Sequence, residues 1–378
     1  MPARIAVVGI HGFGSHWVDR VRSLDRSARA ELAAVVDPAG PDDSGAPWFA
    51  TLGEALAAVE IDVVIVATPI HTHLPLALQA LEAGCDVLLE KPTVASLAEF
   101  ERLVDAVERT GRRCQVGFQT FGSAAVGAVR DAIAAGEIGA LVGIGATGEW
   151  IRDQAYWQRS RWAGRRTLDG VAVVDGVVTN PLAHAVATAL RIGGAYRAAD
   201  VASVELDQWR ANDIEADDTS SVVVTDTGGR RYGFGLTLCA DDGQPPARVL
   251  VFGERGRIEL DYERDVVRVI SAPGDIRETA YERVDLLEDL LAARASGAAL
   301  RADVRETGAF MRVLEGVRTA PDPRRIPAEL VSWEGSGSAS HPVVRDVATW
   351  VRRVAAEQRT FTQLGAPWAR APRDPHAR

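Results

Sequence analysis

The sequence contains a single lysine, Lys91, among its 42 lysine and arginine residues. Arginine stays protonated at any working pH, whereas a lysine ammonium can be desolvated, change its pKa and donate a proton from one compact point. One interpretation is that Lys91 has a chemical role, such as polarising a substrate oxygen. The alternative interpretation is that Lys91 remains by chance in a sequence biased toward arginine.

Lys91 follows a short apolar run and precedes a proline. The run Asp86–Leu89 is typical of a buried strand, and Pro92 cannot continue a central strand. Glu90, Lys91 and Pro92 are therefore expected just beyond the carboxyl end of this strand. In open α/β sheets, ligands bind at that edge.

A glycine-rich turn follows another short run, Ile5–Val8, and precedes a helical pattern. Strand, glycine turn and helix form the context in which a dinucleotide pyrophosphate rests on a helix N-terminus. The spacing departs from G-x-G-x-x-G, because a histidine takes the middle glycine place, and a purely structural turn remains the alternative. The candidate cofactor residues here are Gly9, His11, Gly12, Phe13 and Gly14.

Asp37 ends a second expected strand, Leu32–Val36, at the distance where a ribose-binding acid is expected. A carboxylate there accepts hydrogen bonds from ribose hydroxyls and repels a 2′-phosphate. No arginine follows it in Pro38, Ala39 or Gly40. The sequence therefore predicts NAD(H) as cofactor rather than NADP(H).

Apolar strands alternate with helical segments along the first third of the chain, which favours a parallel sheet. Three strand ends then bring Gly9–Gly14, Thr68–His73 and Glu90–Pro92 to one edge. The expected strands are 5–8, 32–36, 62–67, 86–89 and 114–118.

Several motifs together resemble the Gfo/Idh/MocA oxidoreductase family, over about residues 4–320. The resemblance implies an α/β fold with an NAD(P)-binding Rossmann domain at 1–121 and an α/β domain at 122–330. The open, mainly antiparallel sheet of the second domain commonly mediates oligomerisation in the family, which implies a dimer or tetramer. The motifs are Ala67-Thr68-Pro69-x-x-x-His73, Ala80–Gly84, Glu90-Lys91-Pro92, Gly136–Gly139 and Gly253-x-x-Gly256-x-Ile258.

The family places an Asp-x-x-x-His pair, orienting acid and general base, where this chain has Asn180 and His184. Asparagine can hold an imidazole by a hydrogen bond but cannot stabilise an imidazolium as a carboxylate does. Pro181 suits a first helical turn with Asn180 as its N-cap, which would set Asn180 and His184 on one helix face.

The remaining expected site residues follow from the family resemblance and from the segment 156–166, which is rich in aromatic residues and arginine. Lys91, Asn180 and His184 are the expected catalytic residues, and they also bind substrate together with Trp162 and Arg165. Cofactor contacts are expected, besides the glycine turn and Asp37, from Thr68, Pro69, His73, Glu90 and Lys91. A solvated connection between domains is the alternative for 156–166.

The composition limits the classes of partner that the protein is expected to bind. The net charge of −10 argues against nucleic acid or an anionic membrane, and no apolar run approaches the ~20 residues that span a bilayer. Three dispersed cysteines fit free thiols and offer no metal site. With a strand beginning almost at the first residue, a cytoplasmic protein without a signal peptide is expected.

From Val201 onward, short strands and turns predict an antiparallel sheet, with one broad face free of helices as a candidate dimer surface. Residues 331–378 lie beyond the part of the chain that resembles the family. They are expected to hold a flexible linker or turn at Gly335–Ser338, a helix at Val343–Glu357 and a disordered end.

The sequence thus predicts an NAD-dependent oxidoreductase that acts on a secondary alcohol or ketone of a sugar, polyol or cyclitol-like substrate. Lys91 would polarise the oxygen and His184 would accept the proton. Two alternatives stay open: a redox-neutral lyase or glycosidase that uses transient oxidation, and a non-catalytic dinucleotide-binding subunit.

Overall fold

A computed structural model describes residues 2–41, 43–241, 245–271 and 274–370 of the chain. The chain forms two compact units. One comprises the residues up to Gly122 together with Val284–Met311, and the other comprises Ser123–Arg283 together with the residues from Arg312 onward. The expected disorder of the chain end concerns 371–378, outside the described residues.

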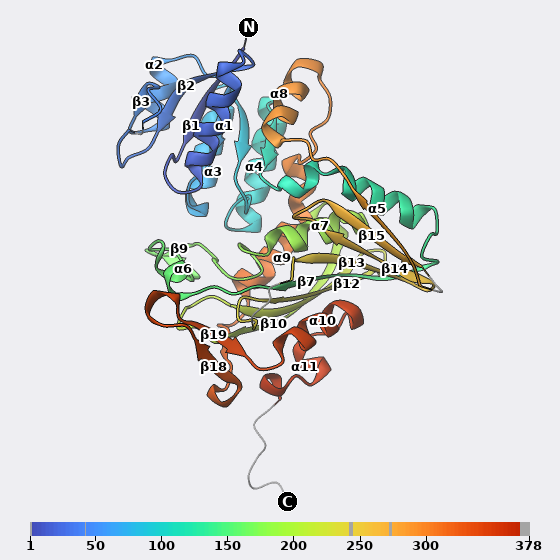
Figure 1. The fold of residues 1–378 in the computed structure, drawn as a ribbon. Coiled ribbons are helices and arrows are strands. Elements are labelled where there is room, and N and C mark those ends of the chain that lie inside the picture. Colours follow the sequence, from blue (N-terminus) through green and yellow to red (C-terminus); the bar gives the residue numbers. More distant parts are fainter. Residues whose placement is uncertain (1, 42, 242–244, 272–273, 371–378) are drawn as a thin grey trace, which may run out of the picture. The chain divides into compact units, whose positions relative to one another are not determined.

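The first unit contains a six-stranded parallel sheet with the order β3-β2-β1-β4-β5-β6 (Figure 1). This is the strand order of a dinucleotide-binding Rossmann sheet. All five expected strands are present, and a two-residue edge strand, β3, is added to them. The strands are β1 (Ala3–Val8), β2 (Ala30–Val36), β3 (Trp48–Phe49), β4 (Val63–Val66), β5 (Asp86–Leu89) and β6 (Cys114–Val116).

Helices follow four of these strands along the chain, and a fifth helix comes from the later segment Val284–Met311. Ser96 caps α4, since its hydroxyl accepts from the Glu99 N–H at 3.2 Å. The helices are α1 (Gly14–Arg26), α2 (Leu52–Ala58), α3 (His73–Glu82), α4 (Leu97–Thr110) and α8 (Leu286–Ser296).

The second unit contains a nine-stranded sheet with the order β16-β15-β14-β13-β7-β12-β11-β10-β17. Among the described strands of this sheet, only β7–β12 and β10–β17 pair in parallel, which confirms the expected open and mainly antiparallel sheet. The strands are β7 (Leu141–Glu149), β10 (Val201–Arg210), β11 (Thr219–Asp226), β12 (Arg231–Thr237), β13 (Arg248–Gly253), β14 (Gly256–Asp261), β15 (Val266–Ser271), β16 (Asp275–Ala280) and β17 (Arg324–Arg325).

Two short hairpins and several helices complete this unit. The expected helix from Val343 begins later, because β19 (His341–Val344) pairs with β18 (Val331–Glu334) around the expected turn. The other elements are α5 (Ala124–Ala134), α6 (Gln154–Gln158), β8 (Thr167–Leu168), β9 (Val171–Ala172), α7 (Ala183–Gly193), α10 (Val347–Glu357) and α11 (Phe361–Leu364), while α9 (Gly308–Thr319) joins the two units along the chain.

Helices α7 and α10 pack on opposite faces of the sheet, over β7 and β12 (Figure 1). The glycines show this alternation: a Cβ at Gly148 would meet Leu182 just before α7, whereas one at Gly145 would meet Ala355 in α10. The expectation of one broad face free of helices is therefore wrong over these central strands, because the C-terminal extension covers them.

Candidate active site

The turn after β1 is shaped by close backbone contacts. Gly9 has φ +81°, and a Cβ there would lie 2.6 Å from the Ala67 carbonyl oxygen. A Cβ on Gly14, the first residue of α1, would lie 1.7 Å from the Gly9 oxygen. Among the described residues no side chain caps α1, so the turn and the helix N-terminus form the backbone cradle that a pyrophosphate needs.

Asp37 lies beside this turn, only 8% exposed. One carboxylate oxygen accepts from the Ile10 N–H at 3.1 Å and the other from the Ala39 N–H at 2.9 Å. The exposed His11 brings Nε2 within 4.0 Å of the same carboxylate. These contacts fix the acid between the ends of β1 and β2, as a ribose-binding carboxylate requires.

His73 connects the segments that follow β4 and β5. It is 1% exposed, with Nδ1 2.9 Å from the Pro92 carbonyl oxygen and Nε2 2.8 Å from that of Thr68. Burial lowers the pKa of His73, although the carbonyl contacts act in the opposite direction. In this arrangement the ring holds backbone in place, and Thr68 and Pro69 remain as the residues that could meet a cofactor.

Glu90 lies buried between α1 and the end of β6. Its Oε1 accepts from the indole N–H of Trp17 at 2.9 Å, and its Oε2 accepts from the Lys91 backbone N–H at 3.1 Å. Gly117 leaves room for it, since a Cβ there would lie 2.9 Å from Oε2. Burial raises the pKa of Glu90, and the charge of Lys91 is the largest opposing influence. The buried carboxylate therefore favours the charged ammonium of its neighbour.

The residues expected around the general base lie in the second unit. His184 is in the first turn of α7, which begins at Ala183. Asn180 lies in the preceding turn, so the prediction that Asn180 and Pro181 open this helix is wrong. The reason lies in the backbone: the Ala183 N–H donates to the Asn180 carbonyl oxygen, three residues back, and Leu182, with φ −107° and ψ 18°, takes the N-cap position. The Asn180 side-chain amide donates to Asp175 Oδ1 at 2.5 Å.

Asp175 organises this segment and was not expected from the sequence. It is 3% exposed, and its Oδ2 accepts from the Gly164 N–H at 2.8 Å and from Arg159 at 3.0 Å. Its Oδ1 accepts from Nδ2 of Asn180. The Asn180 side chain is thus held in place by a buried carboxylate.

An aromatic and arginine cluster extends this network. The Arg159 guanidinium carbon lies 3.7 Å from the ring centre of Tyr156 and 4.6 Å from that of Trp162. Trp162 thus connects to Asp175 and Asn180 through one guanidinium. Arg165 does not join them, because its guanidinium pairs with Glu215 at 3.0 Å.

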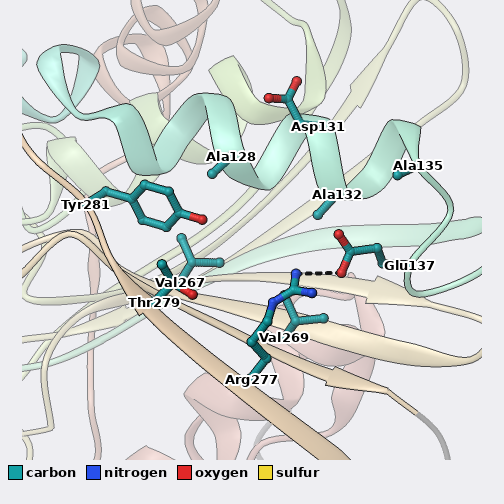
Figure 2. A pocket seen from close by; sticks show the side chains of 10 residues that line it. All are labelled: Ala128, Asp131, Ala132, Ala135, Glu137, Val267, Val269, Arg277, Thr279 and Tyr281. Atoms are coloured by element: carbon teal, nitrogen blue, oxygen red, sulfur yellow. Dashed lines mark hydrogen bonds and ion pairs between the residues drawn. The ribbon is translucent and has the colours of Figure 1, made fainter.

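A pocket of about 400 Å³ lies elsewhere in the second unit, between α5, β15 and β16 (Figure 2). The ion pair between Arg277 and Glu137, 2.6 Å long, lies across it. None of the expected site residues, all of which the structure describes, line this pocket.

Among the described residues, no cluster of histidine, cysteine and carboxylate side chains suits a metal ion. Within the same part of the chain, no helix is long and apolar enough to cross a membrane.

The glycine turn, the acid after β2 and the strand order give the first unit the form of a Rossmann domain. Residues 3–118 match the family described as "Oxidoreductase family, NAD-binding Rossmann fold". The match covers the part of the chain in which the motifs after β4 and β5 resemble the Gfo/Idh/MocA oxidoreductase family.

Proteins of known name that resemble the chain in sequence include inositol 2-dehydrogenase of Corynebacterium glutamicum, 31% identical over 147 residues, or 37% of this chain and 43% of that protein. The rhizopine catabolism protein MocA of Rhizobium meliloti is 30% identical over 139 residues, 35% of this chain and 44% of that protein. The matches therefore span less than half of these relatives.

Solved structures resemble the whole fold. The WlbA dehydrogenase of Bordetella pertussis, crystallised with NADH and UDP-GlcNAcA, has a TM-score of 0.69 at 22% identity, covering 84% of this chain and 95% of that one. An NAD-binding oxidoreductase of Klebsiella pneumoniae has a TM-score of 0.70 at 18% identity, covering 84% and 96%. At these identities the likeness establishes the fold.

Proposed function

We propose that the protein is an NAD-dependent oxidoreductase that oxidises a secondary alcohol, or reduces the ketone, of a sugar, polyol or cyclitol-like substrate. The observation that carries the proposal is the single lysine, placed next to a buried carboxylate at the carboxyl end of a central Rossmann strand. The names of the relatives, inositol 2-dehydrogenase among them, support the substrate class.

The dinucleotide would be held by the Gly9–Gly14 turn, Asp37, Thr68 and Pro69, and the close backbone contacts at Gly9 and Gly14 fit that group. When bound, NAD supplies the acceptor for a hydride from the carbinol carbon. Because Asp37 accepts from ribose hydroxyls and repels a 2′-phosphate, tighter binding of NADH than of NADPH is expected.

The protein's own groups manage charge and protons. The Lys91 ammonium donates a hydrogen bond to the substrate oxygen and stabilises the negative charge that develops there, while Glu90 keeps the amine protonated. His184 accepts the hydroxyl proton. Asn180 supplies a carbonyl that orients His184 or binds a substrate hydroxyl.

Asn180 also supports a second candidate. Here the carboxylate of Asp175 lies behind the Asn180 amide, and position 180 itself carries no acid. The proton taken from the substrate would then leave the site by a different route, which suits a redox-neutral lyase or glycosidase that returns the hydride at the end. Net NADH formation with substrate distinguishes the dehydrogenase, whereas this second enzyme consumes substrate without it. A non-catalytic dinucleotide-binding subunit would bind NADH and convert nothing.

The test is a panel of inositols, sugars and sugar acids with NAD, followed by NADH absorbance and by product analysis. Lys91→Arg keeps the charge but not its position, so turnover is expected to fall about 100- to 1,000-fold. Arg109→Lys is the matched control, because Arg109 makes only an exposed pair with Glu82 in the same unit. Near-normal turnover of Lys91→Arg would refute the role of Lys91.

A further inference from the structure

Arg152 lies just beyond the carboxyl end of β7, in the second unit. The strand ladder continues past the last residue of β7, since the Arg152 N–H donates to the Leu238 carbonyl oxygen at 3.1 Å. Four residues earlier, a Cβ at Gly148 would meet Leu182, which directly precedes α7. Because side chains alternate between the two faces of an extended chain, Arg152 emerges on the same face, the one that carries α7.

Two aromatic rings hold the Arg152 guanidinium in place. Its central carbon lies 4.8 Å from the ring centre of Trp150 and 5.0 Å from that of Tyr156. Nη1 also donates to the Ile151 carbonyl oxygen at 2.8 Å. A guanidinium that stacks on rings keeps the N–H groups along its edges for hydrogen bonds, and less entropy is lost when it binds a ligand. Arg152 is thus a cation held in position before any ligand arrives.

Within the described part of the chain, the carboxylates nearest to Arg152 in the sequence serve other groups. Glu149 pairs with Arg352 of α10 at 2.7 Å. Asp153 accepts from the Tyr156 N–H at 2.9 Å and caps α6. No described carboxylate forms an ion pair with Arg152, whose contacts are the two rings and one carbonyl oxygen. Its Nε is buried, and no described residue accepts its hydrogen, which is uncommon for a buried N–H group.

The Tyr156 ring also connects Arg152 to the network around Asn180. The Arg159 guanidinium carbon lies 3.7 Å from the centre of this ring. Arg159 pairs with Asp175, whose other carboxylate oxygen accepts from the Asn180 amide. Burial raises the pKa of Tyr156, the negative charge of Asp175 adds to the rise, and the charges of Arg159 and Arg152 oppose it. The cation therefore lies one aromatic ring and one ion pair away from the segment that leads into α7.

We propose that Arg152 binds a negatively charged group of the substrate, either a carboxylate or a phosphate, and selects anionic sugars over neutral polyols. The proposal rests on the oxidoreductase function proposed above and narrows its substrate class. A guanidinium donates two parallel hydrogen bonds to the oxygens of either group. The chain has a net charge of −10, so an anionic substrate meets overall repulsion and needs a fixed cation near the Asn180 segment.

The first measurement is ligand binding by the wild-type protein loaded with NADH, followed by isothermal titration calorimetry. The probes are glucose, glucuronate and glucose 6-phosphate, which share a sugar ring and differ in charge. Because charge-assisted hydrogen bonds are about twice as strong as neutral ones, one of the anions should bind about 10- to 100-fold more tightly than glucose. The comparison of the two anions identifies the charged group. Equal affinity for all three probes, or binding of none, would overturn the proposal.

Arg152→Gln and Arg161→Gln form a matched pair, because each removes one positive charge from the same segment. The Arg161 side chain is 79% exposed and pairs with Asp169 at 3.4 Å. Arg152→Gln should bring the affinity for the preferred anion to within about threefold of that for glucose, whereas Arg161→Gln should keep the preference. An equal loss for glucose and anion in Arg152→Gln would indicate a structural role and overturn the proposal, as would the same loss of preference in Arg161→Gln.

Arg152→Lys takes the place of Arg152→Gln if that variant does not fold. It keeps the charge but lacks the planar fork, so the anion preference should fall about fivefold, and an unchanged preference would overturn the assignment. The two proposals fail separately. Formation of NADH from neutral sugars alone would support the oxidoreductase function and overturn the role of Arg152. Anion binding through Arg152 without NADH formation from any substrate would support this site and contradict the oxidoreductase function.

Discussion

Asn180→Asp tests the contact between Asn180 and Asp175, because it restores the aspartate that the Asp-x-x-x-His pattern has at position 180. In the protein, the Asn180 amide donates to Oδ1 of Asp175 at 2.5 Å. An aspartate at 180 replaces that N–H by a second carboxylate oxygen, so two negative charges face one another in a buried site. The variant is isosteric, and comparison with a second variant at Asp175 isolates the part of any stability loss that this contact causes.

The size of the effect follows from the distance and from proton uptake. At a separation of about 3 Å and an effective dielectric constant of about 20, the repulsion is about 5 kcal/mol. The pair can instead hold one proton, which costs about 1.4 kcal/mol for each pH unit above about 4, or about 5 kcal/mol near pH 8. We therefore expect Asn180→Asp to lose about 3–5 kcal/mol near pH 8 and to recover as the pH falls toward about 5.

Adding Asp175→Asn to the same chain should restore what Asn180→Asp removes. Oδ2 of Asp175 accepts from Gly164 and Arg159, whereas Oδ1 faces Asn180. An asparagine at 175 can keep the first two bonds with its carbonyl oxygen and donate its amide N–H to the new carboxylate at position 180. The contact is then the native one with donor and acceptor exchanged. The double variant should therefore lie within about 1 kcal/mol of wild type.

The assay is urea unfolding followed by tryptophan fluorescence, for wild type, both single variants and the double variant, at about pH 5 and about pH 8. Stability of Asn180→Asp equal to wild type near pH 8 would refute the assigned contact. So would a double variant that is no more stable than Asn180→Asp. Turnover measured on the same four proteins then tests separately whether the orientation of residue 180 serves catalysis.

Two further predictions concern buried carboxylates. Glu90→Gln removes the charge beside Lys91, so the ammonium should lose its proton at lower pH, moving the alkaline limb of the turnover profile down by on the order of one unit. An unmoved limb would show that Glu90 does not stabilise the charged amine. Burial and the nearby Asp218 raise the pKa of Asp217 to about 6, against the attraction of Arg166 and the hydrogen bond from Ser220. Because the folded state binds this proton more tightly than the unfolded chain, stability should fall by about 3 kcal/mol as pH rises through the window from about 4 to about 6. Asp217→Asn should remove that fall in a urea titration, and an unchanged pH dependence would exclude Asp217 as its source.

The first unit could be predicted from the sequence because its strands are continuous apolar runs that end in turn residues. The run that became β5 and the acid that follows β2 lie where the pattern placed them. The role of His73 could not be predicted, because its carbonyl partners, on Thr68, Pro92 and Thr93, come together only in the folded sheet. Nor does the sequence indicate that Val284–Met311 packs with the first unit, since contacts distant along the chain decide this.

The start of α7 shows how backbone geometry overrides a local rule. Asparagine before proline is a good helix start by propensity. Asn180 nevertheless lies in a turn, in which its carbonyl oxygen accepts from the Ala183 N–H three residues on. Leu182 then takes the N-cap position, and α7 begins at Ala183 without a side-chain cap from any described residue.

The packing of α10 on the second sheet did leave a signal in the sequence. Gly143-Ile-Gly145 and Gly233-Phe-Gly235 place glycines at every second position of two strands, and glycine inside a strand often marks the close approach of another backbone. Alternation sets both pairs on one face, and the pairing of Gly145 with Gly233 makes them contiguous. A sheet face built for a side-chain interface with a second sheet would carry branched residues there. Glycines instead indicate that a helix backbone of the same chain is the neighbour for which this face is shaped, and α10 is that helix.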